Sequence, residues 1–586
     1  MSNSTLISFT SLRAVFETIL QSGGEDSSFN YLALAKAHSV ELGLGVFTVF
    51  ITRHIYKLLK GANTFNELDG PQPASSIWGD ENLLSDFEKG LPAQDELLHR
   101  YGTVCKIKGP LGEDRLWLAD PRAINDIVLK GFDHFHEPTG LLAWFKLIFG
   151  PTMLAEVGHK HKIQRKILNP VFTAAHMRKF TVTPIFHTIT HYLEVVVTSK
   201  VRAGGGNTGI VDIYAWMSNV ALEMIGQAGI GYSFGVMEGK EPEYLDASRQ
   251  VFTLMNSMWY IRPFLPTLMK IGPARFRRFI VDRISFSPVH QLQKDINIMD
   301  KMSTEIYTQK KQALANGTLD SEIAAGNDII SMLLKQNEIV SPDEQMTEEE
   351  ILAQVNGLIF AGHDTTSGGL ARTLHLLAQH PMVQDQLRAE VREAHGLHGK
   401  ELDYDQLNSL KYLDAVCRES LRLWSPAQLL ERTAMKDWNL PLHYPVKSKD
   451  GKKTITNLHV PEGTYIYVSL GSVNRDKQTW GDDAEQFNPS RWLQPLPLSV
   501  AESKIPGVYS NIMTFSGGPR SCLGFKFSQL EMKIVLAALI SSFKFELGPE
   551  EHMWMVAGIV KPHVRREDGT IDPNPSLRMK VTLVEE

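Results

Sequence analysis

Apolar residues recur along most of this chain with the spacing of amphipathic and buried helices. From Ala123 onward, long stretches place apolar residues three or four positions apart, which aligns them on one face of a helix. β-Branched and aromatic residues are concentrated at 101–118, at 460–470 and at 579–584, and these segments predict short strands. The pattern therefore predicts a mainly α-helical protein with small β-sheets.

Two turn-forming segments add detail to this picture. Gly109-Pro110-Leu111-Gly112 divides the first β-rich segment into two strands, because glycine and proline interrupt regular structure. The run at 445–453 is rich in residues typical of turns, so it predicts a surface hairpin.

The N-terminal part contains one short apolar run. This run, at 42–52, is shorter than the roughly 20 apolar residues that a membrane-spanning helix needs. It favours either a membrane anchor over about 42–60 or an ordinary amphipathic or buried helix. If the run spans a membrane, the basic residues at 53–60 place the rest of the chain in the cytosol.

A proline-rich hinge separates this N-terminal part from the rest. Pro71 and Pro73 cannot continue a helix, because proline fixes the backbone angle and lacks an N–H group. We therefore expect an N-terminal segment at 1–69, a hinge at 70–79 and a catalytic domain at 80–586.

The composition is that of a globular protein with a large core. Of the 586 residues, 43% are hydrophobic and 22% are charged. The 60 basic and 66 acidic residues give a net charge of −6, so no overall positive field favours nucleic acid. The cysteines Cys105, Cys417 and Cys522 form no CxxC pair, which argues against a zinc site and a disulfide framework and fits a reducing compartment.

The segment from Phe515 to Gly524 carries the strongest chemical signal. Cys522 precedes a helix-forming run, and the exposed N–H groups at a helix start favour an ionised sulfur that can bind a metal. Gly518 and Gly524 let the backbone approach a flat cofactor. Arg520 is placed to pair with a carboxylate, and Phe515 is placed to shield the sulfur from water. Taken alone, a cysteine in such a turn is more often a small apolar residue.

A second polar element interrupts the apolar helical pattern at 351–377. Asp364 and Thr365 lie there, after the small residues Ala361 and Gly362. Polar groups in an apolar helix are costly without partners. One interpretation is structural: Thr365 donates back to a carbonyl, and Asp364 points to solvent. The other is functional: the small residues leave room for dioxygen, and a local break in the helix frees a hydroxyl that relays protons from Asp364 or water.

Several motifs, distant from one another in the sequence, resemble those of the cytochromes P-450. The cysteine loop matches the haem-binding pattern Phe-x-x-Gly-x-Arg-x-Cys-x-Gly, and 361–366 resembles the family's Ala/Gly-Gly-x-Asp/Glu-Thr-Thr element. Glu419 and Arg422 match a Glu-x-x-Arg helix, and 487–491 matches Phe-x-Pro-x-Arg. The resemblance implies the triangular, mainly α-helical fold of this family.

The resemblance also implies roles at a cofactor. Cys522 is the implied axial ligand of haem b, and Asp364 and Thr365 are the implied acid and alcohol of oxygen activation. Arg432 and Arg165 are candidates for pairing with the haem propionates, because the planar fork of arginine suits a carboxylate.

The same resemblance implies a supporting set of residues. Glu419 and Arg422 lie three residues apart on one helix face, and flanking leucines indicate burial. With Arg491 they are expected to brace the cysteine loop rather than to take part in chemistry. His161 stands four residues before Arg165, where the family commonly has a tryptophan, and it joins the expected cofactor-binding residues.

The activity implied by the resemblance is that of a haem-dependent monooxygenase. Such an enzyme inserts one oxygen atom of O2 into an apolar organic substrate, here a lipid, a terpenoid or another secondary metabolite. Electrons are expected from NADPH through a separate flavoprotein reductase. The extended chain is similar to fungal microsomal members, which implies the endoplasmic reticulum membrane, with the catalytic domain in the cytosol.

Two sets of residues are expected to meet these partners. Five lysines have two possible interpretations: they form a basic face that binds the reductase, or they are an ordinary solvated charge pattern. These lysines are Lys160, Lys162, Lys166, Lys526 and Lys533. Five segments are expected by family analogy to line the substrate site, and they lie at 141–154, 252–264, 358–365, 427–430 and 556–560. Their aromatic and aliphatic content suits an apolar compound.

Two other functions compete with this one. A haem-thiolate isomerase or dehydratase would rearrange a peroxide without activating oxygen, and the intact Asp364-Thr365 pair argues against it. A non-catalytic haem- or ligand-binding membrane protein would show haem but no reductase-dependent product. A requirement for NADPH and reductase during turnover separates both alternatives from a monooxygenase.

Overall fold

The computed structural model describes residues 48, 52, 64–178, 185–321 and 323–584. The described residues from 64 onward belong to one compact unit, Gly61–Glu586. The anchor predicted over about 42–60 lies outside the described residues, except for Thr48 and Thr52. Among the described residues, no helix is both long and apolar enough to cross a membrane. The boundaries expected for the hinge and the catalytic domain stay predictions.

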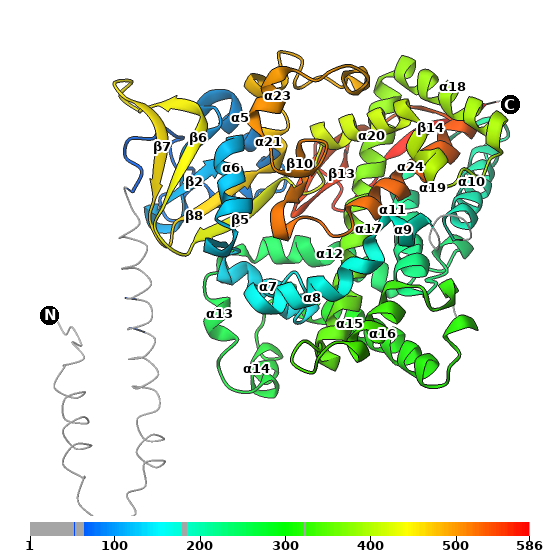
Figure 1. Ribbon diagram of the computed structural model, residues 1–586, viewed down its shortest axis with the longest axis horizontal. Coiled ribbons are helices and arrows are strands. Elements are labelled where there is room, and N and C mark those ends of the chain that lie inside the picture. The colour runs from blue at the N-terminus through cyan, green and yellow to red at the C-terminus, as the bar shows by residue number, and fades with distance from the viewer. Residues whose placement is uncertain (1–47, 49–51, 53–63, 179–184, 322, 585–586) are drawn as a thin grey trace, which may run out of the picture. The chain divides into compact units, whose positions relative to one another are not determined.

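Helices dominate the described residues, so the predicted mainly α fold with small sheets is confirmed (Figure 1). The longer helices are α5 (Gly90–Tyr101), α7 (Thr139–Phe149), α8 (Gly158–Leu168), α10 (His187–Arg202), α11 (Ile213–Met224), α12 (Glu243–Ser257), α14 (Ala274–Val281), α15 (Ser287–Ala315), α16 (Ile329–Ile339), α17 (Glu348–Gln379), α18 (Pro381–His398), α20 (Lys411–Leu423) and α24 (Phe525–Ser542). Shorter helices are α4 (Glu81–Leu84), α6 (Pro121–Asn125), α9 (Ala174–His176), α13 (Leu265–Leu268), α19 (Tyr404–Ser409), α21 (Leu470–Val473), α22 (Lys477–Trp480) and α23 (Leu498–Ser503).

The strands of the described residues form five small sheets. The largest has the order β1-β2-β8-β5-β3, and the others pair β6 with β7, β9 with β10, β12 with β13, and β14 with both β4 and β11. The strands are β1 (Val104–Lys108), β2 (Asp114–Leu118), β3 (Phe135–His136), β4 (Thr208–Asp212), β5 (Leu429–Ala434), β6 (Trp438–Lys447), β7 (Thr454–Val460), β8 (Tyr465–Ser469), β9 (Gly507–Tyr509), β10 (Ile512–Gly517), β11 (Phe543–Glu546), β12 (Glu551–Ala557), β13 (Ile559–Arg565) and β14 (Arg578–Leu583).

The strands predicted from β-branched and aromatic content are confirmed. β1 and β2 pair in antiparallel register across the predicted turn at 109–112, and β2 pairs in parallel with β8. β14 occupies the predicted C-terminal strand segment, and the β6–β7 hairpin encloses the turn predicted at 445–453. The β12–β13 hairpin was not predicted, although its strands pair over seven residues each.

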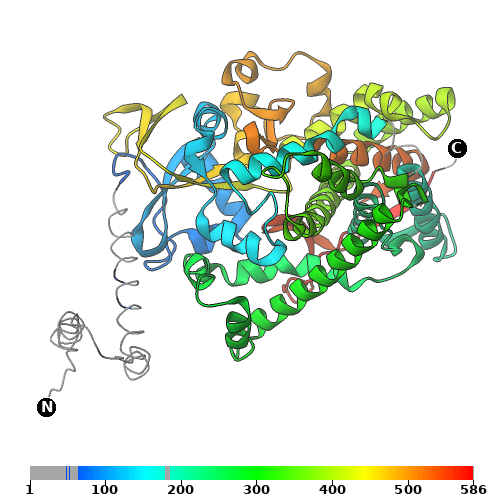
Figure 2. The ribbon, with the colours of Figure 1, turned by 60° about the horizontal axis from the view of Figure 1, so that its bottom comes forward.

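The helix α17 lies in the middle of the helical part and is buried along most of its length. It begins with a reciprocal cap, in which the backbone N–H of Glu350 donates to Thr347 Oγ1 and that of Thr347 donates to the Glu350 carboxylate. It contacts α11, α15, α20 and α24, as well as β13. Figure 2 shows α15 as the long green helix that runs along one side of this part. Because α17 is buried on most of its faces, neighbouring elements cover it nearly all round, and its buried polar side chains need partners among them.

A carboxyl group without a partner lies in the core beside these helices. Glu531 of α24 has no exposed surface, and neither of its carboxyl oxygens has a hydrogen-bond partner among the described residues. Because burial disfavours the charged form, the pKa of Glu531 is raised well above its usual value of 4.5. The folded protein therefore keeps the Glu531 proton to a higher pH than the unfolded chain does.

This burial predicts a pH dependence of stability. Above pH 4.5 the unfolded chain loses the Glu531 proton while the folded chain keeps it, so the free energy of unfolding falls as pH rises. Glu531→Gln removes this linkage. We expect its melting temperature relative to the wild type to increase steadily between pH 4.5 and pH 8 in calorimetry. Glu567→Gln, at an exposed position, is the matched control and should show no such trend. A constant difference between Glu531→Gln and wild type would contradict the neutral state of Glu531.

Candidate active site

The cysteine loop connects β10 to α24. A short 3₁₀ turn, Gly518–Arg520, follows the strand, and Gly524 is the N-cap of the helix. The backbone N–H of Cys522 donates to the carbonyl of Phe515 at 2.9 Å, which closes the loop. Cys522 is exposed, whereas Cys105 and Cys417 are buried. The loop therefore presents the one sulfur of the three that a cofactor can reach.

Gly518 is required by the protein backbone itself. Its φ is +67°, and a Cβ atom there would lie 2.0 Å from the carbonyl oxygen of Val128. Gly524 has an ordinary negative φ and open space, with Phe172 as the nearest neighbour at 3.7 Å. Gly518 is therefore needed by the fold itself, and the expectation that both glycines let the backbone approach a cofactor stays a prediction.

The charge state of Cys522 reflects two opposing effects. Desolvation by the surrounding loop raises the pKa of the thiol to about 11. The backbone N–H of Gly524 and the positive charge of Arg165 act in the opposite direction, as expected for a helix start, but they do not outweigh desolvation.

Three arginines and one glutamate gather beside the loop. Glu137 Oε1 lies 2.9 Å from Arg520 Nε and 3.3 Å from Arg432 Nη1. Arg165 instead donates to the carbonyl of Ser521 at 2.6 Å. The pairing of Arg520 with a carboxylate is thus confirmed, and its partner Glu137 was not predicted. Three positive charges and one negative charge leave two positive charges in this arginine cluster.

His161 completes the same region from the helix α8. It is 2% exposed, and its Nδ1 has no hydrogen-bond partner among the described residues. Burial, together with the positive charges of Arg520 and Arg165, lowers the pKa of His161 to about 4. Its neutral ring leaves a polar atom that an added group can satisfy.

Asp364 and Thr365 lie on α17, which is one continuous helix over Glu348–Gln379. Thr365 Oγ1 donates to the carbonyl of Ala361 at 2.8 Å, so the predicted local break that frees a hydroxyl is wrong. The reason is that this bond to the preceding turn satisfies the partly buried hydroxyl without breaking the helix. The expectation that Asp364 points to solvent is also wrong, because the residue is 1% exposed.

The partner of Asp364 is a lysine that the sequence did not indicate. Lys561 Nζ, from β13, lies 2.9 Å from Asp364 Oδ1, and the two side chains are 5% and 1% exposed. The C-terminal hairpin therefore supplies the counter-charge for the acid in α17. A buried charge of this kind persists only with a partner.

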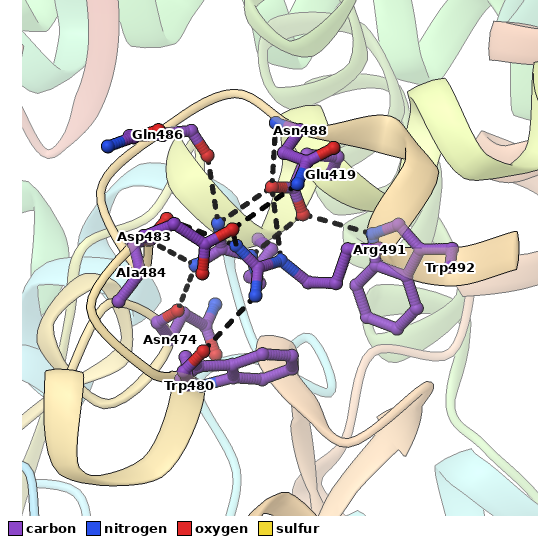
Figure 3. A network of polar contacts seen from close by, with 10 residues as sticks. Glu419, Asn474, Trp480, Asp483, Ala484, Gln486, Asn488, Arg491 and Trp492 are labelled. Atoms are coloured by element: carbon purple, nitrogen blue, oxygen red, sulfur yellow. Dashed lines mark hydrogen bonds and ion pairs between the residues drawn. The ribbon is translucent and has the colours of Figure 1, made fainter. Parts of the chain in front are cut away.

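The expected supporting residues are brought together as a buried ion-pair network (Figure 3). Arg422 donates to both carboxylate oxygens of Glu419 at 2.8 Å, and neither side chain has exposed surface. Arg491 Nε lies 3.4 Å from Glu419, and Trp492 Nε1 donates to the same carboxylate at 3.0 Å. The predicted grouping of Glu419, Arg422 and Arg491 is therefore seen in the contacts.

Asn474 links this network to the cysteine loop. Arg422 Nη1 donates to the Asn474 carbonyl at 2.8 Å. The Asn474 side chain accepts from the N–H of Met513 at 2.7 Å and donates to Thr514 Oγ1 at 3.0 Å. Met513 and Thr514 belong to β10, the strand that leads into the loop. Asn474 was missed because a single asparagine carries no local pattern.

One of the lysines predicted to form a basic face is buried. Lys533 is 2% exposed and lies 2.7 Å from Asp414, so it cannot contribute to a surface. Lys160, Lys162 and Lys166 are exposed, and each is within 3.3 Å of a carboxylate. A helical lysine pattern does not reveal which face of α24 is buried.

Four of the five segments expected to line the substrate site meet at one cavity of about 120 Å³. Leu141 and Trp144 come from α7, Met255 from α12, and Leu429 and Val556 from the sheets. The segment at 358–365 does not line it. The wall of this cavity combines apolar side chains with a similar number of polar and charged ones.

The described residues fit a haem group. Cys522 offers an exposed sulfur, the arginine cluster has two uncompensated positive charges, and haem b carries two propionates. In the same region, the Nδ1 atom of His161 has no hydrogen-bond partner within the described part of the chain. Sulfur ligation at a helix start and charge pairing at arginines are the two contacts that such a group requires.

Comparisons with known proteins agree with this fit. The family model for cytochrome P-450 matches residues 82–563. Cytochrome P-450 monooxygenase 91 of Postia placenta is 40% identical over 527 residues, which cover 89% of this chain and 94% of that protein. Cytochrome P-450 monooxygenase 219 of the same fungus is 42% identical over 500 residues, covering 84% and 90%. Ganoderic acid synthetase of Ganoderma lucidum is 40% identical over 488 residues, covering 82% and 87%.

The chain therefore belongs to the cytochrome P-450 family, and the resemblance seen in the motifs is confirmed. It is a P-450 monooxygenase, and membership of this family implies a haem cofactor.

The buried pair of Lys561 and Asp364 predicts a specific pattern of stabilities. Lys561→Met leaves the Asp364 carboxylate buried without a counter-charge, which we expect to cost about 3–5 kcal/mol of unfolding free energy. The double variant Lys561→Met/Asp364→Asn should recover most of this loss in denaturant titrations. Lys580→Met, which breaks an exposed pair with Glu546, is the control and should cost about 1 kcal/mol or less. Equal losses in the single and double variants would contradict the pairing.

Proposed function

We propose that this monooxygenase inserts one oxygen atom of O2 into an apolar organic substrate, such as a lipid, a terpenoid or another secondary metabolite. The observation that carries this proposal is the cavity where four expected substrate segments meet, with apolar side chains from each. One relative is named a ganoderic acid synthetase, which supports an organic metabolite rather than a macromolecule as the substrate.

Cys522 is the proposed axial ligand of the haem iron, because it is exposed at the end of a loop that the buried network braces. Haem, when bound, supplies the activation of dioxygen. Phe515 packs beside the loop and is 9% exposed, so it is suited to keep water from the sulfur.

The arginine cluster is the proposed binding site of the haem propionates. Arg432 and Arg520 share Glu137, so their guanidinium groups are already held in position. His161 adds its unpartnered Nδ1 atom. Arg165, which donates to Ser521, orients the cysteine loop in addition to contributing charge.

Thr365 and Asp364 are the proposed carriers of the protons that O–O cleavage consumes. The Thr365 hydroxyl donates to Ala361, and its oxygen can still accept a hydrogen bond from a second donor. Asp364 forms an ion pair with Lys561, so this acid is held in position within the low-dielectric core.

The proposed electron donor is NADPH, acting through a separate flavoprotein reductase. Lys160, Lys162 and Lys166 are exposed on α8, where an acidic partner would compete with the carboxylates that now pair with them. The proposed location is the endoplasmic reticulum membrane with the catalytic domain in the cytosol, supported by the basic residues that follow the apolar run at 42–52.

The experiment that tests this function is turnover under labelled oxygen. Purified protein, reductase, NADPH and a panel of apolar compounds are incubated under ¹⁸O₂, and the product masses are measured by mass spectrometry. We expect one ¹⁸O atom in the product, only when NADPH and reductase are both present. In Thr365→Ala, product per NADPH should fall by about tenfold or more, because the proton carrier is lost. An unlabelled product that forms without NADPH would indicate an isomerase or dehydratase. Haem binding without any product would indicate a non-catalytic protein. Either result would contradict the proposal.

A further inference from the structure

The cavity of about 120 Å³ contains polar side chains that the fold does not use. Its wall is built by α5, α7, α12, β5 and the end of β12, and it includes Gln94, Trp144, Asn256, Arg262 and Glu431. Each of these polar groups needs a hydrogen-bond partner from the protein, from water or from a ligand, because burial without a hydrogen bond is costly.

Three of these groups are satisfied by the protein itself. Arg262 donates to both carboxylate oxygens of Glu431, and the bond from Nη1 to Oε1 is 3.1 Å long. The Tyr465 hydroxyl also donates to this carboxylate. Asn256 Nδ2 donates to the carbonyl of Ser85 at 2.5 Å. The charges of Arg262 and Glu431 cancel, so the cavity offers no free charge to an ion.

Gln94 and Trp144 are different. Gln94 is 2% exposed, and neither its amide nitrogen nor its amide oxygen has a hydrogen-bond partner in the described part of the chain. Trp144 is 3% exposed, and its indole Nε1 is likewise without a partner there. Both residues line the cavity. Two donors and one acceptor are therefore buried and unused at the cavity wall, which is rare in native proteins.

We propose that Gln94 and Trp144 bind a hydroxyl group of an otherwise apolar substrate. A hydroxyl can accept from an N–H group and donate to the Gln94 carbonyl oxygen, so it satisfies both kinds of unused atom. A ketone could not use the Gln94 oxygen, and a carboxylate would be repelled by that oxygen and by Glu431. Leu141, Met255 and Leu429 contact the hydrocarbon part.

This inference rests on the proposed function, since it narrows the substrate to a hydroxylated apolar compound. It makes Gln94 a specificity residue that acts away from the reacting C–H bond. Sites built to bind a substrate hydroxyl reject the analogue that lacks it more strongly than apolar pockets reject an extra carbon, because the polar groups of the site are left unpaired.

The first test needs no ligand. Gln94→Met replaces the unpartnered amide with an apolar chain of similar shape, and we expect the melting temperature to rise by a few degrees because a buried unsatisfied amide is removed. Gln428→Met is the matched control. Gln428 lines the same cavity and is 3% exposed, but its Nε2 already donates to the Ser425 carbonyl at 2.5 Å, so its loss should lower the melting temperature. A lower melting temperature for Gln94→Met would overturn the proposal.

The second test uses three small probes with one ring: cyclohexane, cyclohexanol and cyclohexanecarboxylate. Their dissociation constants for the haem-loaded protein follow from the rise in melting temperature with probe concentration. We expect cyclohexanol to bind wild type about tenfold or more tighter than cyclohexane, a difference of about 1.4 kcal/mol. Gln94→Met and Trp144→Phe should each reduce this preference at least threefold, and Gln428→Met should keep it.

Each other outcome overturns the inference in a distinct way. Equal binding of cyclohexanol and cyclohexane, or no binding of either, means that the amide does not recognise a hydroxyl. If cyclohexanecarboxylate bound most tightly, Arg262 rather than Gln94 would be the residue that binds the polar group of the ligand. Because these measurements require no turnover, an enzyme that incorporates ¹⁸O but shows no hydroxyl preference refutes the inference alone. A protein with the preference but no ¹⁸O product refutes the proposed function alone.

Discussion

The buried ion pair between Glu419 and Arg422 is the constraint on which the site depends. Both side chains are fully buried, so each charge must recover its lost hydration from the protein. Arg422 does so through the carbonyls of Asn474 and Ala484, and Glu419 through Trp492 and the Arg491 guanidinium. The pair thereby fixes segments that are 52 to 72 residues away in the chain.

From this pair, a short chain of contacts reaches the sulfur. Asn474 holds β10 by two hydrogen bonds, β10 leads into the cysteine loop, and the N–H of Cys522 closes the loop on Phe515. The arginine cluster then sets the charge on the flank of the loop. Motifs of the family that are distant in the sequence are thus connected by direct contacts. The connection runs from the buried ion pair to the cysteine loop.

Two ion pairs show how charges near the site are stabilised within the protein. Asp364 is paired with Lys561 and Arg262 with Glu431, because an isolated charge in the core is too costly. Among the described residues, several neutral groups lack a hydrogen-bond partner, including Gln94, Trp144, His161 and Glu531, and each asks for a cause. At Gln94 and Trp144 the cause that we infer is a ligand, since both line a cavity, and Glu531 avoids the cost of charge by keeping its proton.

The sequence predicted most of what is local or repeated. Apolar spacing was enough for the helices, and β-branched content for β1, β2, β8 and β14, because both depend on neighbours in the chain. The grouping of Glu419, Arg422 and Arg491 came from spacing and family motifs together. Glu137, Asn474 and Lys561 were missed, since each is a single polar residue whose partner lies more than 38 positions away. The predictions of a free Thr365 hydroxyl and of an exposed Lys533 were wrong, because side-chain direction on a buried helix depends on tertiary packing.

The claim that Cys522 is the iron ligand is tested most directly by the absorption spectrum of the reduced protein under carbon monoxide. We predict the red-shifted band that is specific to sulfur-ligated haem in the wild type, and its loss in Cys522→Ser. Absence of this band from the wild-type protein loaded with haem, or its persistence in Cys522→Ser, would contradict the assignment.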